Sequence, residues 1–256
     1  MLQPLWKSKA ETAARLRGRI ERVLDAAKAK GFRMGENPAR WRGHLDSLLP
    51  KRQKLTRGHH AAMPFAEVPG FLGRLRDMEG IGARALEFLI LTATRTGEVI
   101  GARWNEIDLS ERVWIVPAAR MKAAREHRVP LTERAVEILN GMAGVRTGDF
   151  VFPGFRRDRS LSNMAMRMTA RRAGVEQTVH GFRSAFRDWA GERTNFPREI
   201  AEAALAHVVG DATERAYRRG DALEKRRALM EAWAIFCEPN TRNVVVPLAQ
   251  PKRGRR

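Results

Sequence analysis

Residues 83–117, with the sequence ARALEFLILTATRTGEVIGARWNEIDLSERVWIVP, decide the fold class of this chain. The first part is strongly apolar and predicts a buried helix over 83–94. The last six residues, RVWIVP (112–117), have the composition of a β-strand. A polar loop follows, and then HRVPL (127–131) predicts a second strand. We therefore expect a small hairpin or a three-stranded antiparallel sheet directly after a buried helix.

Helical patterns dominate the rest of the main part of the chain. Val68, Phe71, Leu72 and Leu75 lie on one face of a predicted helix. Further helices are predicted over 132–143, 160–173, 179–193, 197–206, 211–219 and 221–236. The expected fold class is mainly α with a small antiparallel β-sheet, in the α+β class.

The first 58 residues form a basic segment of their own. They hold 15 Lys and Arg against 5 Asp and Glu, a net charge of +10, whereas the remaining residues carry +9. Apolar residues at helical spacing predict a helix that ends at Gly31, and a second short helix is predicted over 37–49. The stretch 50–64 shows neither the helical nor the strand spacing of apolar residues and predicts a linker. We expect a nucleic-acid-facing segment over 1–58, a main domain over 59–240 and a basic tail over 241–256.

Composition limits the class of protein. The 256 residues carry a net charge of +19, and 43% of them are hydrophobic, which predicts a folded protein with a polyanionic partner. Nucleic acid is the first expectation and an anionic membrane surface the second. The sequence lacks an apolar run of membrane-spanning length and the apolar centre of a signal peptide, which favours a cytoplasmic protein. The single cysteine, Cys237, excludes an internal disulfide and a cysteine-based zinc cluster.

Several common reaction classes lack their residue patterns. The sequence contains no GxxxxGK[ST] phosphate loop, HExxH helix, GxSxG elbow or paired-acid calcium loop. Nucleotide hydrolysis and metalloprotease chemistry are therefore not expected. The sequence also shows no carboxylate cluster suited to Mg²⁺, so we expect no metal. We also expect no cofactor and no small-molecule substrate.

Five polar residues stand out. Tyr217 is the sole tyrosine and lies among arginines in ERAYRRGD, although an amphipathic helix residue with an exposed hydroxyl is the common alternative. His180 and Arg183 stand three apart at the start of a predicted helix, about 60° apart around its axis, so both can reach one anion. His207 interrupts an apolar run, where a satisfied core histidine is the alternative. Arg95 follows the buried helix and could simply complete its C-terminus.

Taken in order, these residues resemble the catalytic boxes of tyrosine recombinases, specifically integrases of bacterial prophages and genomic islands. The resemblance covers residues 60–237, and its motifs are TATRTGEVIGARWNEID, the lysine of RMKAAREHRVPL, HGFR, AHVVG and AYRRGD. It implies a catalytic function for Arg95, Lys122, His180, Arg183, His207 and Tyr217. It also implies that Glu98, the acid after the first arginine, supports Arg95.

The implied reaction is site-specific cleavage and rejoining of DNA through a covalent 3′-phosphotyrosine. Tyr217 would be the nucleophile, and Arg95 and Arg183 would stabilise the non-bridging phosphate oxygens. His180 and His207 would hold the phosphate and assist proton movement. Lys122, in the loop of the predicted hairpin, would protonate the departing 5′ oxygen. The implied partner is double-stranded DNA at attachment sites, bound by a homo-oligomer at the bacterial nucleoid.

The N-terminal part departs from the family pattern. LWKSKAETAARLRGRIERVLDAA and NPARWRGHLDSLL resemble only the last part of a core-DNA-binding domain. Two alternative functions therefore stay open. One is a non-catalytic DNA-binding remnant of an integrase that occupies attachment sites. The other is a type IB topoisomerase, which would use the same residues to relax supercoils, although the prophage-like ending AYRRGDALEKRRALMEAWA disfavours it.

Overall fold

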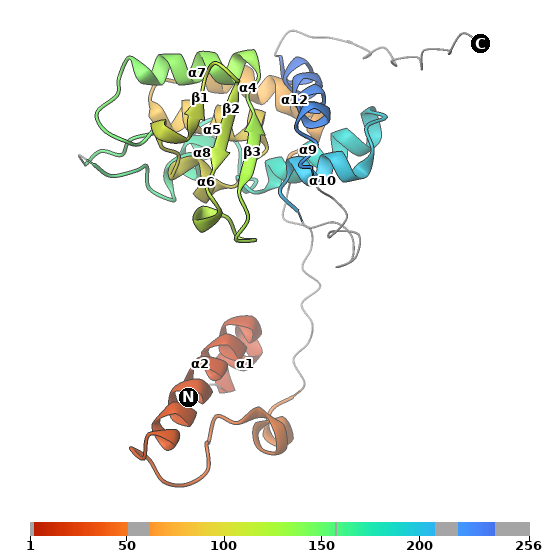
Figure 1. Cartoon of the computed structure of the whole chain (residues 1–256). Helices are drawn as coiled ribbons and strands as arrows, with labels where there is room; N and C mark the ends of the chain where they lie inside the picture. Colours follow the sequence, from red (N-terminus) through yellow and green to blue (C-terminus); the bar gives the residue numbers. More distant parts are fainter. Residues whose placement is uncertain (1–2, 51–61, 157, 208–219, 239–256) are drawn as a thin grey trace. The chain divides into compact units, whose positions relative to one another are not determined.

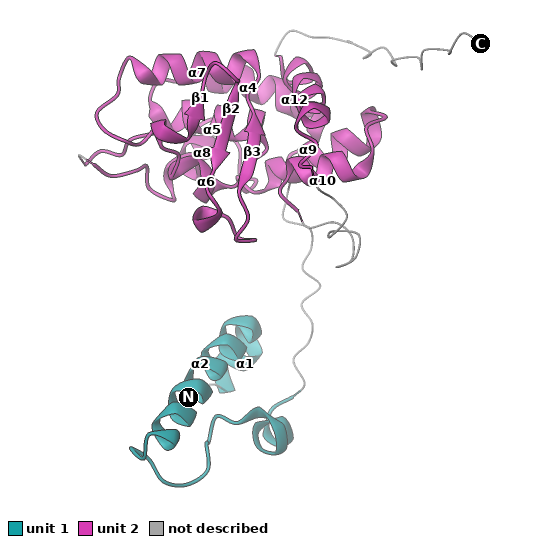
Figure 2. Cartoon of the chain, viewed as in Figure 1, with its two compact units in different colours: residues 1–58 teal, residues 59–256 magenta. Residues whose placement is uncertain are grey.

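The computed structural model describes residues 3–50, 62–156, 158–207 and 220–238. The chain divides into two compact units, residues 1–58 and residues 59–256 (Figure 2). Most of the predicted linker, the helix predicted over 211–219 and the predicted tail over 241–256 lie outside the described residues. Each unit has its own set of helices (Figure 1).

The smaller unit contains α1 (Gln3–Ser8), α2 (Ala10–Ala29), the turn η1 (Trp41–Leu45) and α3 (Asp46–Leu48). The predicted end of the long helix at Gly31 is confirmed. Gly31 has a φ of 73°, and the N–H groups of Gly31 and Phe32 donate to the carbonyls of Lys28 and Ala27 at 3.0 and 2.9 Å. Glycine adopts this left-handed conformation without strain, so it closes the helix.

The second helix of this unit, predicted over 37–49, is wrong over most of its length. Arg42 has an extended ψ of 128° and Gly43 a φ of 70°, which interrupt the helical path. The carboxylate of Asp46 accepts from the N–H groups of Gly43 and His44 at 3.2 and 3.1 Å. These bonds stabilise a turn instead of a helix, because a short acidic side chain competes for backbone donors. Only the turn of α3 remains helical.

The larger unit is built mainly from helices. They are α4 (Val68–Arg76), α5 (Ile81–Thr92), α6 (Thr96–Ile100), α7 (Glu133–Ala143), α8 (Ala165–Arg172), α9 (Gly181–Arg193), α10 (Arg198–Ala204) and α12 (Leu223–Cys237). Short 3₁₀ turns are η2 (Phe65–Glu67), η3 (Trp104–Glu106) and η4 (Ala118–Arg120). Among the described residues, no helix is long and apolar enough to cross a membrane.

Helix α5 is the centre of the core of this unit. Every residue from Ala85 to Thr92 is buried, and the helix packs on α4, α6, α7, α8 and α12. Trp233 of α12 donates its indole N–H to the carbonyl of Ile90 at 2.8 Å. The apolar composition that predicted a buried helix here is therefore explained by neighbours on several sides.

The sheet consists of β1 (Ile107–Asp108), β2 (Val113–Val116) and β3 (His127–Pro130), antiparallel and in that order. Trp114 of β2 pairs with Val129 of β3, and its ring packs 5.5 Å from that of Phe88 on α5. The sheet thus covers one side of the central helix (Figure 1). The predicted fold class, mainly α with a small antiparallel sheet, is confirmed.

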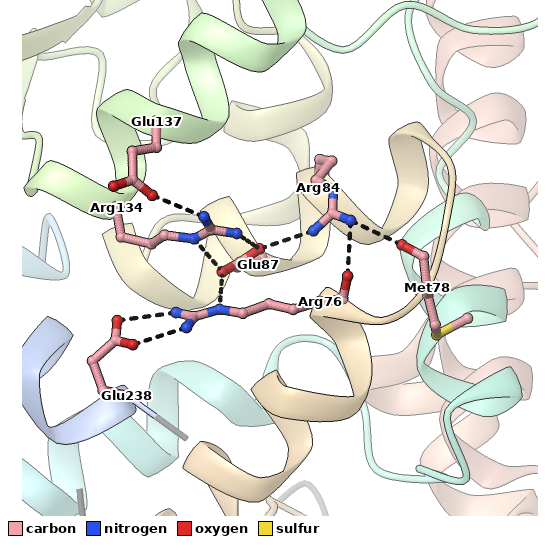
Figure 3. Close-up of polar contacts among 7 residues, drawn as sticks. All are labelled: Arg76, Met78, Arg84, Glu87, Arg134, Glu137 and Glu238. Atoms are coloured by element: carbon pink, nitrogen blue, oxygen red, sulfur yellow. Dashed lines mark hydrogen bonds and ion pairs between the residues drawn. The ribbon is translucent and has the colours of Figure 1, made fainter. Parts of the chain in front are cut away.

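A buried carboxylate joins several of these helices (Figure 3). The side chain of Glu87 on α5 is 0% exposed and accepts from Arg76 of α4 at 2.6 Å and from Arg134 of α7 at 2.8 Å. Arg84 approaches it at 3.4 Å. Arg76 also pairs with Glu238, directly after α12, at 2.8 Å. We call these five residues the Glu87 cluster. It fixes three helices and the end of a fourth around one charge.

Candidate active site

A pocket of about 880 Å³ opens in the larger unit. Its described lining is strongly basic, and Glu202 is the acidic residue in it. The basic residues of the lining are Arg95, Lys122, His180, Arg183, Arg187, Arg198 and His207. Five of the six predicted catalytic residues therefore line one pocket. The sixth, Tyr217, lies outside the described residues.

One face of α9 forms part of this lining. His180 precedes the first turn of the helix, and Arg183, Ser184 and Arg187 follow at three, four and seven residues. Residues at this spacing lie on the same side of a helix, which explains how one helix supplies four lining residues. His180 and Arg187 are exposed, whereas Arg183 is 4% exposed.

Arg183 is held by main-chain carbonyls. One terminal nitrogen donates to Ala93 at the end of α5, where the backbone is left-handed with a φ of 50°. The other donates to Leu205, after α10, at 2.6 Å. Burial, together with the nearby charge of Arg95, lowers the pKa of Arg183 to about 10. The guanidinium therefore stays charged at neutral pH while its position is fixed by two separate segments.

Arg95 occupies the turn between α5 and α6. Its backbone N–H donates to one carboxylate oxygen of Glu98 at 2.9 Å, and its guanidinium donates to the other at 2.8 Å. The Glu98 side chain is 4% exposed. This buried carboxylate fixes both the main chain and the side chain of Arg95. The predicted contact between Glu98 and Arg95 is therefore present.

His207 lies three residues after the end of α10 and contacts two charged side chains. Its Nδ1 is 2.6 Å from a carboxylate oxygen of Glu202, and its Nε2 is 3.2 Å from a terminal nitrogen of Arg183. Glu202 also accepts from Arg187 at 2.7 Å. Burial opposes ionisation of Glu202, but the bonds from His207 and Arg187 hold its pKa below the usual value. Glu202 is therefore a carboxylate at neutral pH.

Lys122 is exposed in the loop between β2 and β3, at the position that the predicted hairpin gave it. The same hairpin also contains a buried histidine, His127. His127 begins β3, and burial and the charge of Arg226 lower its pKa to about 4. It also forms a hydrogen bond with the backbone of Ala204. His127 is therefore neutral and connects the sheet to the end of α10.

Sequence reasoning missed four residues around the site. Arg187 continues the spacing of His180 and Arg183 by one helical turn, so the pattern HGFRSAFR could have indicated it. Glu202 interrupts the same apolar run as His207, which is a weaker signal. Arg198 and His127 carry no local signal, because their relation to the site depends on how α10 and β3 are packed.

The described residues contain no group of three or more His, Cys, Asp or Glu side chains arranged to hold a metal ion. The charge available to bind an anion in the pocket is instead that of the arginines and Lys122. Two of these arginines already have fixed guanidinium groups. Such preorganised donors suit phosphoryl oxygens, which accept from the planar guanidinium fork.

Comparison with protein families gives two matches. Residues 74–224 match the Phage integrase family, and residues 1–44 match the Phage integrase central domain. The first match contains the whole predicted set of catalytic residues. The second lies within the smaller unit.

Two curated relatives are prophage integrases of Escherichia coli strain K12. The chain is 40% identical to IntA over 149 residues, which cover 57% of this chain and 36% of IntA. It is 34% identical to IntZ over 239 residues, which cover 91% of this chain and 57% of IntZ. The chain therefore spans at most 57% of the length of either relative.

Among solved structures, the chain resembles a lambda integrase dimer bound to a COC′ core site. The TM-score is 0.59 with 17% identity, over 81% of this chain and 76% of that one. At this identity the similarity concerns the fold.

Proposed function

Because the chain belongs to the phage integrase family of tyrosine recombinases, we propose that it is a site-specific DNA recombinase. It would cut and rejoin DNA strands through a covalent 3′-phosphotyrosine at Tyr217. The observation that carries this proposal is the pocket in which Arg95, Lys122, His180 and Arg183 meet His207. A metal-free phosphoryl transfer requires such a concentration of fixed positive charge.

The proposed reaction assigns each group one task. The Tyr217 hydroxyl gives its proton to a pocket histidine, its oxygen forms a bond to the scissile phosphorus, and the bond from phosphorus to the 5′ oxygen breaks. Arg95 and Arg183 bind the non-bridging oxygens, where negative charge develops. Lys122 gives a proton to the departing 5′ oxygen, and His180 and His207 hold the phosphate and assist proton movement. Reversal of these steps joins the strand to a new 5′ end.

The proposed substrate is duplex DNA at attachment sites. Each chain has one tyrosine, so every strand cut in two recombining duplexes needs its own copy of the chain. This stoichiometry supports a homo-oligomer on DNA, as does the lambda integrase dimer bound to a core site. We assign backbone binding of the duplex to the basic residues 1–58 and catalysis to residues 59–240. A DNA substrate of this kind places the protein at the bacterial nucleoid, in the cytoplasm.

A second candidate is a DNA-binding remnant that occupies an attachment site without cutting it. The observation that favours it is the net charge of +10 over residues 1–58, which supports binding to duplex DNA and does not require cleavage. Both candidates predict binding to duplex DNA. They differ in whether a covalent adduct forms.

The deciding experiment captures that adduct. The protein is incubated, in excess chelator, with a pool of nicked duplexes of random sequence, so that a cleaved strand is lost and the adduct accumulates. Adducts that survive denaturation are isolated, and their DNA is sequenced. We expect an enriched sequence with the wild-type chain and no adduct with Tyr217→Phe. Binding without any adduct in the wild type would favour the remnant.

A further inference from the structure

Glu202 contacts His207 in two ways. Its carboxylate lies 2.6 Å from Nδ1 of the ring, and its carbonyl oxygen accepts from the His207 backbone N–H at 2.9 Å. The Glu202 side chain is 8% exposed, whereas that of His207 is 41% exposed. A buried group on α10 therefore holds an exposed ring at the edge of the pocket.

The partners of His207 determine which ring nitrogen carries the proton. Arg183 has only donors, so the ring nitrogen beside it, Nε2, must accept. Glu202 is ionised and has only acceptors, so Nδ1 must donate. In the absence of DNA, these two contacts are both satisfied by a neutral ring with its proton on Nδ1.

The other oxygen of Glu202 is also occupied. It accepts from Arg187 at 2.7 Å, and Arg198 lies 3.7 Å from it. Arg187 lies on α9, so the carboxylate on α10 is also held from a neighbouring helix. Rotation of the carboxylate away from the ring would break the bond with Arg187. The orientation of the ring is therefore determined by buried partners and not by the solvent.

We propose that Glu202 is a positioning residue that keeps the His207 proton on Nδ1 and leaves Nε2 as the atom that exchanges a proton with the reacting groups. Nε2 faces Arg183, which binds the phosphate in the proposed reaction. The His207 ring and Arg183 would therefore contact the same phosphate. When Nε2 takes a proton, the carboxylate offsets the charge that the ring gains. The part of this inference that concerns catalysis rests on the proposed function.

The first test is spectroscopic and does not need DNA. Ring nitrogens are recorded by NMR in the full chain labelled with ¹⁵N-histidine, and His207 is identified by the signals that His207→Gln removes. We expect a protonated Nδ1 and an unprotonated Nε2 in the wild type at mildly alkaline pH. A wild-type ring protonated on Nε2 overturns the proposal, whatever any variant does.

Glu202→Gln supplies the matched comparison. The amide keeps the size of the side chain but adds a donor, so the Nδ1-protonated form should lose its preference. The control is Glu199→Gln, on the same helix but only half-buried and outside the pocket lining. It should leave the His207 signals unchanged. An unaltered His207 pattern in Glu202→Gln counts against the proposal, provided that the other histidine signals show a folded chain.

The second test measures adduct formation in a single turnover on a nicked duplex taken from the random pool. Loss of the carboxylate partner of a metal-bound histidine costs about 10–100-fold, and we expect a loss of similar size in Glu202→Gln with unchanged duplex affinity. Glu199→Gln should react like the wild type. Equal rates in Glu202→Gln and wild type would remove Glu202 from the reaction. If the wild type forms no adduct, the proposed function fails, whereas the NMR result still decides the role of Glu202.

Discussion

The carbonyl oxygen of Leu205 accepts a 2.6 Å hydrogen bond from Arg183, which lies 22 residues earlier in the chain. This bond joins the pocket face of α9 to the segment that carries His207. Arg95 approaches the same carbonyl at 3.5 Å. Arg95 and Arg183, the two arginines predicted to bind the non-bridging phosphate oxygens, therefore approach the same main-chain oxygen. The position of that oxygen depends on α10.

Arg183→Lys should lose about 10²–10³-fold in the rate of adduct formation, the effect of removing a preorganised donor. A lysine ammonium cannot donate to Ala93 and Leu205 with the planar fork that both carbonyls receive here. The measurement is single-turnover cleavage of a nicked duplex. Arg193→Lys, at the other end of α9, is the control and should cleave normally. A fully active Arg183→Lys variant would show that charge without geometry is sufficient.

Lys122→Ala should slow cleavage by about 10²–10⁴-fold, the scale of a positioned general acid. A duplex with sulfur in place of the bridging 5′ oxygen should restore most of that rate, because a thiolate hardly needs a proton to leave. The sulfur substrate should not restore the rate of the Arg183→Lys variant, since Arg183 acts on the non-bridging oxygens. Equal slowing of Lys122→Ala on both substrates would mean that Lys122 only binds DNA.

The salt dependence of duplex binding should show whether the smaller unit contacts DNA phosphates. Arg19 and Arg22 are exposed on α2. Replacing both with Gln should lower the slope of log K against log salt by about 0.9 for each phosphate that the variant no longer neutralises. The slope is measured by fluorescence anisotropy over a range of salt concentrations. An unchanged slope would place the backbone contacts of the duplex elsewhere.

His127 should make stability depend on pH. Its folded pKa of about 4 lies below the 6.5 of a free histidine, so between these values the unfolded chain binds a proton that the folded chain does not. The free energy of unfolding should therefore fall as the pH falls through this window, by about 3 kcal/mol in total. His127→Gln should lack this component in denaturant titrations. Parallel pH profiles of wild type and variant would contradict the prediction.

Glu87→Gln should destabilise the chain by about 3–5 kcal/mol, because it removes the buried carboxylate that three arginines share as a counter-charge. Glu137→Gln is the matched control. It removes a partner of Arg134 whose side chain is 56% exposed, so the change should stay within about 1 kcal/mol. Denaturant unfolding of both variants checks the difference. Similar losses of unfolding free energy in the two variants would mean that the buried carboxylate of Glu87 stabilises the chain no more than a solvent-exposed pair does.

The sequence predicted the helices whose apolar residues recur at regular spacing. Val68, Phe71, Leu72 and Leu75 are all buried on α4, as their spacing required. It also predicted the hairpin from β-branched composition. It was wrong where one side chain competes for backbone donors, as Asp46 does over 43–46. Periodicity reports burial, whereas such a competition depends on a local hydrogen bond that periodicity does not register.

The residues of the candidate site could also be predicted from the sequence only in part. The order and identity of Arg95, Lys122, His180, Arg183, His207 and Tyr217 come from the sequence alone, since each lies in a short motif that resembles a catalytic box of tyrosine recombinases. Their roles remain proposals. The contact between Glu98 and Arg95 could also be predicted, because three residues at the start of a helix bring the two side chains together.

Tertiary structure alone decided what surrounds those residues. Arg183 bonds to Ala93 across 90 residues, and His127 reaches Ala204 from the sheet. The first contact requires α9 to pack against the end of α5, and the second brings β3 to the end of α10. The division of the Glu202 carboxylate between Arg187 and His207 requires α9 to lie beside α10. Local sequence sets which side chains share a helix face. The partners of a buried charge come from distant segments, and only the packing of the core brings them within hydrogen-bond distance.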